Sequence, residues 1–343
     1  MTTQHLSPLT MLLSRHTRRR TFITLLGGAA AAWPLAARAQ QPAMPVVGFV
    51  SSRSLDGSAR YAAAFNKALS EAGYIEGQNV AVEYHWLGGQ YARLPSLMAD
   101  LARRRVAVIA TAGDPATLAA KAATSIIPIA FGISEDPVRH GVVASLARPG
   151  GNATGINFLT MEVVPKRLGL LHELAPTAVR VAVLVNPSNP LVAEATLRDV
   201  PDAARAAGLQ VHSYNATSSR EIEAAFAAIV RDRADALFVA PDGFFNARRV
   251  QFVTLAMRYR VPAAYPAREF VEVGGLMSYG TDPLDMYRQV GVYTGRILKG
   301  ANPADLPVVQ STKFEFVINA QTARALDLEL PNSVQLLADE VIE

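Results

Sequence analysis

The sequence predicts an α/β protein built from two similar lobes, each a parallel sheet flanked by helices. Short runs rich in Val, Ile and Ala alternate with helical stretches, which is the pattern of βαβ units. The chain has 343 residues, more than one hydrophobic core usually serves. The runs fall into two sets with similar spacing. The expected strands are 46–50, 80–84, 106–110 and 127–131, then 181–185, 210–214, 236–240 and 261–265.

The helices between these strands are indicated by apolar stripes and by end signals. Tyr61, Phe65 and Leu69 recur with helical spacing, and Gly73 follows as a left-handed stop. Three aspartates stand directly before a proline, which predicts an N-cap with proline at the first helical position. They are Asp114, Asp136 and Asp282. Two polar, turn-rich breaks at 148–152 and 278–282 are candidate crossings between the lobes.

The composition describes a globular protein and excludes several classes of site. Half of the residues are hydrophobic and 18% are charged, which excludes a disordered chain. The sequence contains no cysteine, which excludes disulfides, thiol catalysis, zinc fingers and iron–sulfur clusters. It also leaves no cysteine to lipidate, so we expect no lipid anchor.

Residues 1–39 have the composition of an export signal. They hold five arginines and no acid. Four of the arginines precede an apolar run from Leu25 to Ala32, and the fifth, Arg38, lies in a small-residue site that ends at Ala39. The run is too short to span a bilayer. Arg19 and Arg20, a spacer and then Phe22 resemble the twin-arginine (Tat) export motif. We therefore expect a soluble periplasmic protein after cleavage near Ala39.

The positive charge of the chain lies mostly in that segment. The whole sequence carries a formal net charge of +4, with 33 basic and 29 acidic side chains. Removing the five arginines leaves 28 basic side chains against the same 29 acidic ones, a net charge of −1. A nucleic-acid partner is therefore not expected.

The motifs that would indicate a nucleotide cofactor, a metal or catalysis are missing from the sequence. Val50 is followed by Ser51, Ser52, Arg53 and Ser54 rather than by GxGxxG, and GxxxxGK[ST] and GxSxG do not occur. The histidines after the export signal have no metal-ligand spacing. We expect neither a cofactor nor a metal site, and we expect a protein that is not an enzyme.

The loops that follow the strands are the candidate binding site. In open α/β sheets, ligands bind beyond the carboxyl ends of the strands. These loops are small and polar, and several lead into a helix whose free N–H groups favour a carboxylate. The candidate contacts are Ser51, Ser52, Thr111, Gly113, Asp114, Asp136, Asn186, Asp242, Phe244, Tyr265 and Tyr279.

Some of these candidates also have a structural interpretation. Asp114 and Asp136, like Asp282, would be explained as helix caps without any ligand. Asp242 has no such explanation, and Phe244 beside it would supply an apolar wall. Tyr265 and Tyr279 end two expected strands and would face either the cleft or the core.

Several segments together resemble the ABC transporter substrate-binding proteins of the tryptophan/tyrosine-binding type. They are Ile127-Pro128-Ile129-Ala130-Phe131 with Asp136-Pro137, Arg148-Pro149-Gly150-Gly151-Asn152, Ile297-Leu298-Lys299-Gly300 and Val317-Ile318-Asn319. The resemblance implies a type I periplasmic binding fold: two Rossmann-like lobes joined by a three-segment hinge, with the ligand cleft between them. Lobe one would comprise 46–157 and 282–305, and lobe two 158–281 and 306–343.

The resemblance also implies the function. The family's aspartate in lobe two falls on Asp242, but Gly243 follows it where the family has asparagine. The expected ligand is therefore a small carboxylate, either an amino acid, which would be aromatic in the family, or an aromatic acid. Lobe closure would capture it, and a monomer would deliver it to a permease in the inner membrane. A ligand-sensing module for a receptor kinase and an exported α/β enzyme remain alternatives.

Overall fold

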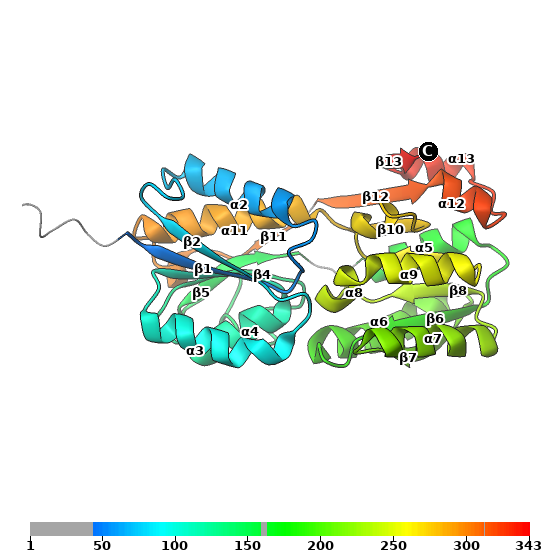
Figure 1. Cartoon of the computed structure of the whole chain (residues 1–343), viewed down its shortest axis with the longest axis horizontal. Coiled ribbons are helices and arrows are strands. Elements are labelled where there is room, and N and C mark those ends of the chain that lie inside the picture. The colour runs from blue at the N-terminus through cyan, green and yellow to red at the C-terminus, as the bar shows by residue number, and fades with distance from the viewer. Residues whose placement is uncertain (1–43, 159–162, 312) are drawn as a thin grey trace, which may run out of the picture. The chain divides into compact units, whose positions relative to one another are not determined.

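The computed structural model describes residues 44–158, 163–311 and 313–343 (Figure 1). All the helices and strands described below lie in one compact unit, Pro45–Glu343. The expected export signal, with its cleavage site near Ala39, lies outside the described residues and stays a prediction.

Six parallel strands form the first sheet, in the order β11-β5-β4-β3-β1-β2. The four strands expected from the sequence are present, each within two residues of the expected bounds. Two further strands, β5 and β11, border them on one side. The strands are β1 (Val46–Ser51), β2 (Ala81–Trp86), β3 (Val108–Ala112), β4 (Ile129–Ile133), β5 (Ala153–Asn157) and β11 (Val309–Gln310).

Helices cover both faces of this sheet (Figure 1). On one face, α2 (Ala59–Glu71) and α11 (Pro283–Leu298) pack with the sheet around Phe49 and Phe65. On the other face, α3 (Leu94–Arg104) and α4 (Asp114–Ala123) enclose a second cluster. The left-handed stop is confirmed, since Gly73 has a φ of +88° after α2 ends. The short turn η1 (Tyr91–Arg93) precedes α3.

The second sheet has seven strands, in the order β13-β12-β10-β9-β8-β6-β7. Its neighbouring strands are parallel except for the antiparallel pair β10 and β12. The four expected strands are again present within two residues. The strands are β6 (Arg180–Val185), β7 (Gln210–Asn215), β8 (Ala236–Val239), β9 (Ala263–Tyr265), β10 (Met277–Thr281), β12 (Phe314–Asn319) and β13 (Glu340–Ile342).

Two apolar clusters lie on opposite faces of this sheet. One is formed with α5 (Val164–Leu174), α6 (Pro190–Ala206), α12 (Ala320–Ala325) and α13 (Asn332–Leu337). The other is formed with α7 (Ser219–Arg231), α8 (Gly243–Ala247), α9 (Arg249–Arg258) and α10 (Arg268–Val271). The chain therefore has the α/β architecture that the sequence predicts, with two mostly parallel sheets between layers of helices.

The chain passes between the two sheets three times: between β5 and α5, between β10 and α11, and between β11 and β12. The proposed crossing at 148–152 is wrong, because that segment joins β4 to β5 within one sheet. The expected crossing at 278–282 holds only at its end, because the chain passes between the sheets at Asp282, between β10 and α11. Most of that segment is strand β10, whose pairing with β9 and β12 overrides its turn-like composition.

The third passage lies later than expected. The resemblance implies that residues 306–343 belong to lobe two, but Val309 and Gln310 pair with Ile156 and Asn157 of the first sheet. A strand of two residues is too short to give a sequence pattern. The η2 turn (Pro303–Asp305) precedes it.

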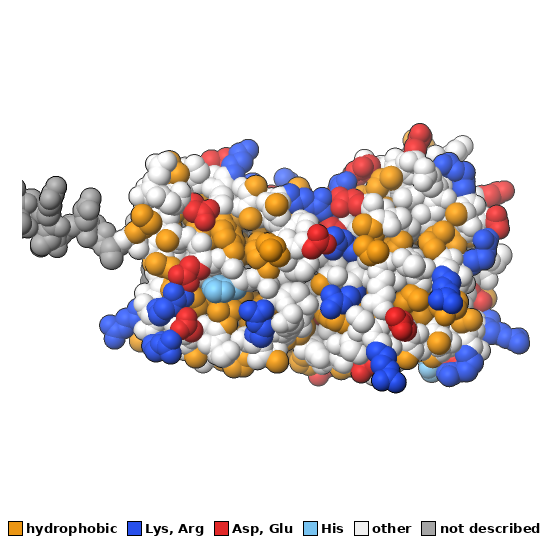
Figure 2. Space-filling view, viewed as in Figure 1, with side chains coloured by type: hydrophobic (Ala, Val, Ile, Leu, Met, Phe, Trp, Pro, Cys, Tyr) orange, Lys and Arg blue, Asp and Glu red, His pale blue; other side chains and the backbone are white. Residues whose placement is uncertain are grey.

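None of the helices in the described part of the chain is long and apolar enough to cross a membrane. On the face shown in Figure 2, Lys and Arg side chains are interspersed with Asp and Glu. That mixture differs from the single-sign surface that typically binds nucleic acid.

Candidate functional site

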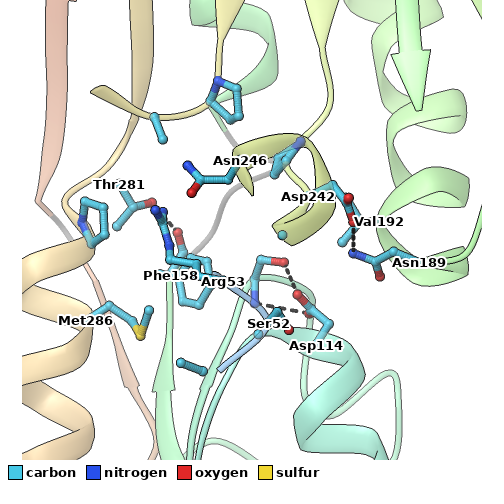
Figure 3. Close-up of a pocket in the computed structure, with 18 of the residues that line it drawn as sticks. Ser52, Arg53, Asp114, Phe158, Asn189, Val192, Asp242, Asn246, Thr281 and Met286 are labelled. Carbon is cyan, nitrogen blue, oxygen red and sulfur yellow. Dashed lines mark hydrogen bonds between the residues drawn. The ribbon is translucent and has the colours of Figure 1, made fainter. Parts of the chain in front are cut away.

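A cavity of about 120 Å³ lies where strand ends and helix starts from both sheets meet (Figure 3). Its lining comes from the loops of both sheets and from the start of α11. The residues that matter below are Ser52, Tyr91, Asp114 and Ser134 from the first sheet, Asn189, Asp242, Asn246 and Phe270 from the second, and Asp282, Met286 and Tyr287 from the start of α11. The position agrees with the rule that ligands bind beyond the carboxyl ends of strands.

Asp242 is the N-cap of α8, and five donors surround its carboxylate. Oδ1 accepts from Asn186 Nδ2 at 2.9 Å and from the backbone N–H groups of Phe244 and Phe245 at 2.9 and 3.2 Å. Oδ2 accepts from Tyr91 Oη at 2.8 Å and from Asn189 Nδ2 at 3.2 Å. Burial raises the pKa of Asp242 above its usual range, although these hydrogen bonds oppose the shift.

Asp114 is a buried carboxylate on the opposite wall. It accepts from the backbone N–H of Ser134 at 3.1 Å, from that of Glu135 at 3.0 Å and from Ser134 Oγ. The expected helix cap is therefore wrong here: the side chain turns to the loop after β4, and Gly113 occupies the N-cap position. Burial raises the pKa of Asp114.

The other two aspartates that precede proline differ from each other. Asp282 caps α11 by accepting from Leu284 N at 2.8 Å, which confirms the expected cap. Asp136 accepts from Val138 N at 2.8 Å and Arg139 N at 3.2 Å. That bonding stabilises a turn rather than a helix, because the residues after Pro137 do not continue as one.

Two buried donors in the cavity wall have no hydrogen-bond partner among the described residues. They are Ser52 Oγ, directly after β1, and Asn246 Nδ2, on α8. Ser52 is 7% exposed and Asn246 8%. In Figure 3 the Asn246 amide points into the cavity, toward the side that Phe158 and Thr281 line. Because buried polar groups are usually paired, such donors indicate a ligand that supplies an acceptor.

Arg53 is the cation among the described lining residues, and Glu269 neutralises it. The two side chains form an ion pair, and Tyr61 Oη donates to the same carboxylate. Burial would raise the pKa of Glu269, but Arg53 and Tyr61 outweigh it and the pKa is lowered. The lining thus has Asp114, Asp242 and Asp282 as carboxylates without a cationic partner inside the cavity.

The structure brings some of the expected site residues together. Ser52, Gly113, Asp114 and Asp242 line the cavity. Two others act through a lining residue. Ser51 Oγ is 2.7 Å from Tyr287 Oη, and Asn186 donates to Asp242.

The remaining expected residues are not among those that line it. Thr111 Oγ1 pairs with Thr117 Oγ1 at 2.9 Å, and Phe244 packs beside Phe245 with ring centroids 6.0 Å apart. Asp136 lines a separate cavity. Each tyrosine stacks on a phenylalanine, with ring centroids 4.6 Å apart for Tyr265 and Phe270 and 6.3 Å apart for Tyr279 and Phe314.

Sequence reasoning missed Asn246, Arg53 and Tyr91. Asn246 lies four residues after Asp242, which is one helical turn, so that spacing was a usable signal. Arg53 stands in the loop after the first strand, directly after the candidate Ser52. Tyr91 follows β2, and the candidate loops do not include the one after that strand.

The chain is similar to known proteins in sequence and in fold. It is 27% identical over 266 residues to the tyrosine-binding protein of Clostridioides difficile (strain R20291), covering 77% of this chain and 76% of that protein. A solved structure from Streptococcus pneumonia, an ABC domain in complex with L-Trp, has a TM-score of 0.76 and 25% identity. It covers 86% of this chain and 100% of its own.

A conserved domain protein from Vibrio cholerae O1 biovar El Tor str. N16961 has a TM-score of 0.79 and 24% identity, covering 87% of this chain and 99% of its own. That likeness supports the fold alone. The family profile described as "ABC transporter substrate binding protein" matches residues 44–342. Since that match includes both sheets and the cavity between them, the chain belongs to the family of ABC transporter substrate-binding proteins.

Proposed function

We propose that this protein is the periplasmic component of an ABC importer, that it captures an amino acid, and that it delivers it to a permease in the inner membrane. The observation that carries the proposal is the cavity between the two sheets, with an unpaired donor and a carboxylate contributed from each side. A ligand that contacts both sides favours the closed arrangement, and closure creates the surface that a permease recognises. The twin-arginine export signal that the sequence predicts over 1–39 supports the periplasmic location.

The charges of the cavity favour an amino acid over an aromatic acid. The lining has the carboxyl groups of Asp114, Asp242 and Asp282 and no free cation, because Glu269 already neutralises Arg53. A monoanion would be repelled there, whereas an ammonium group would be attracted. Ser52 Oγ and Asn246 Nδ2 then remain for the ligand carboxylate. The two relatives whose names state a ligand, tyrosine and L-Trp, are consistent with this class.

A thermal-shift screen tests the proposal with pairs of compounds. Each L-amino acid is compared with the acid that lacks the α-amino group, on the purified protein. We expect amino acids to raise the melting temperature and the deaminated acids to leave it unchanged, since ligand at 100 times its Kd adds about 2.7 kcal/mol. No stabilisation by any amino acid would contradict the proposal.

Asn246→Asp is expected to weaken binding of the amino acid at least about tenfold, because it replaces a buried donor by a fourth carboxylate facing the ligand carboxylate. Isothermal titration calorimetry measures the loss. Asn215→Asp is the matched control, since Asn215 is exposed at the end of β7. Equal affinities for the two variants would show that Asn246 does not contact the ligand.

A further inference from the structure

Tyr91 connects the first sheet to the second across the cavity. Its hydroxyl donates to Asp242 Oδ2 at 2.8 Å and accepts from Gly243 N at 3.2 Å. The loop before it is fixed to the end of β1, because Leu87, Gly88 and Gly89 donate their N–H groups to the carbonyls of Ser51, Arg53 and Ser52. Tyr91 therefore sits on a well-bonded loop and its ring occupies the space beside Asp242.

Two glycines allow the loops after β1 and β2 and the start of α8 to come into main-chain contact. Gly89 has a φ of +78°, and a Cβ there would overlap Phe244. At Gly243 a Cβ would overlap the carbonyl oxygen of Ser52. The loop of the first sheet and the start of α8 are therefore as close as main chains can be. A side chain at either position would hold the two sides apart.

The remaining space is small. The cavity measures about 120 Å³. An apolar cavity of about 150 Å³ holds one benzene ring. Tyr91, Phe158, Phe270 and Tyr287 already occupy its edges with rings. An indole or phenol together with an amino-acid main chain is larger than one benzene ring and so needs more space than this cavity has in the structure.

We propose that Tyr91, with the contacts at Gly89 and Gly243, acts as a size filter that restricts the closed site to an amino acid with a small side chain. The proposal rests on the proposed function and narrows its ligand class. It separates this protein from its relatives whose names state tyrosine or L-Trp. Tyr91 is thus a specificity-determining residue, and its hydroxyl positions Asp242.

The test measures a rank order of affinities by calorimetry on the purified protein. The panel is glycine, L-alanine, L-serine and L-threonine against L-tyrosine and L-tryptophan. We expect the wild type to bind its best small amino acid at least about tenfold more tightly than either aromatic one. In Tyr91→Ala the filter is removed. The ratio of the affinity for the best small amino acid to that for an aromatic one is expected to fall by about tenfold or more.

Tyr91→Phe separates size from hydrogen bonding, and it keeps the ring if Tyr91→Ala fails to fold. It should retain the preference for small ligands while all affinities fall by about two- to tenfold, the value of one hydrogen bond. Tyr214→Phe is the control, because Tyr214 donates to Asp232 at 3.1 Å away from the cavity lining. It should change neither affinity nor rank order.

Two results would overturn the filter while leaving the proposed function intact. One is a wild type that binds tyrosine or tryptophan more tightly than every small amino acid. The other is a Tyr91→Phe variant that loses the preference although its ring is unchanged. Failure of every amino acid to bind would instead overturn the proposed function, and the filter with it.

Discussion

Glu135→Gln is expected to stabilise the protein at alkaline pH and to change little at pH 5. Glu135 follows β4, is 6% exposed, and its Oε1 has no hydrogen-bond partner among the described residues. Burial, with the charge of Asp114 as a second cause, raises the pKa of Glu135 from 4.5 to about 8. Arg139 and, from α6, Arg198 oppose that shift, whereas Asp199 adds to it.

The direction of this pH effect on stability follows from the number of protons that the folded and the unfolded protein bind. Between pH 4.5 and about 8 the folded protein keeps the Glu135 proton that the unfolded chain has released. Stability therefore falls as the pH rises through that window, and above it the whole cost is present. At about 1.4 kcal/mol for each pH unit, the cost approaches roughly 3–5 kcal/mol at pH 9. Glutamine has the same shape and no titration, so it removes this decline.

Urea unfolding of both proteins at pH 5, 7 and 9 measures the effect. The difference in the free energy of unfolding, variant minus wild type, should grow from below about 1 kcal/mol to several. Glu173→Gln is the control, because Glu173 is exposed on α5 and its substitution should change stability by less than about 0.5 kcal/mol at each pH. A difference for Glu135→Gln that is constant across the three pH values would show that Glu135 ionises normally.

The strands were predictable from the sequence where burial on both faces produces an apolar run. β1 and β6 are of this kind, and the structure has them within two residues of the expected bounds. β5 reads Ala-Thr-Gly-Ile-Asn and β10 reads Met-Ser-Tyr-Gly-Thr, both with turn-like composition. Their strand conformation comes from pairing on both sides, which no local pattern shows.

The site was predictable as a set of loops but not as a set of side chains. The carboxyl-end rule pointed to the loops that hold Ser52, Asp114 and Asp242. Whether an aspartate faces a ligand or another part of the protein depends on partners distant in sequence. Tyr91 meets Asp242 across 151 positions, and Ser134 meets Asp114 across 20. Such contacts can be identified only from the folded structure, in which the two elements lie side by side.

Arg167→Met is expected to raise the free energy of unfolding at pH 7. Arg167 lies on α5 with no exposed surface, and none of its three guanidinium nitrogens has a hydrogen-bond partner among the described residues. Its guanidinium carbon lies 4.1 Å from the ring centroid of Phe238. Burial lowers the pKa of Arg167 to about 9. The free-energy cost of burying an unpaired charge in an apolar core is larger than the stabilisation from one cation–π contact.

Methionine fills a similar volume without the charge, so the gain should be about 1–4 kcal/mol, the range found when buried ion pairs are replaced by apolar side chains. Because the folded pKa is lowered, the unfolded state binds more protons above pH 9, and the wild type alone should gain stability there. Urea unfolding at pH 7 and pH 10 measures both effects. Arg205→Met is the control, since the Arg205 side chain is 76% exposed, and it should stay within about 0.5 kcal/mol. Destabilisation by Arg167→Met would mean that an anion pairs with Arg167 in the folded protein.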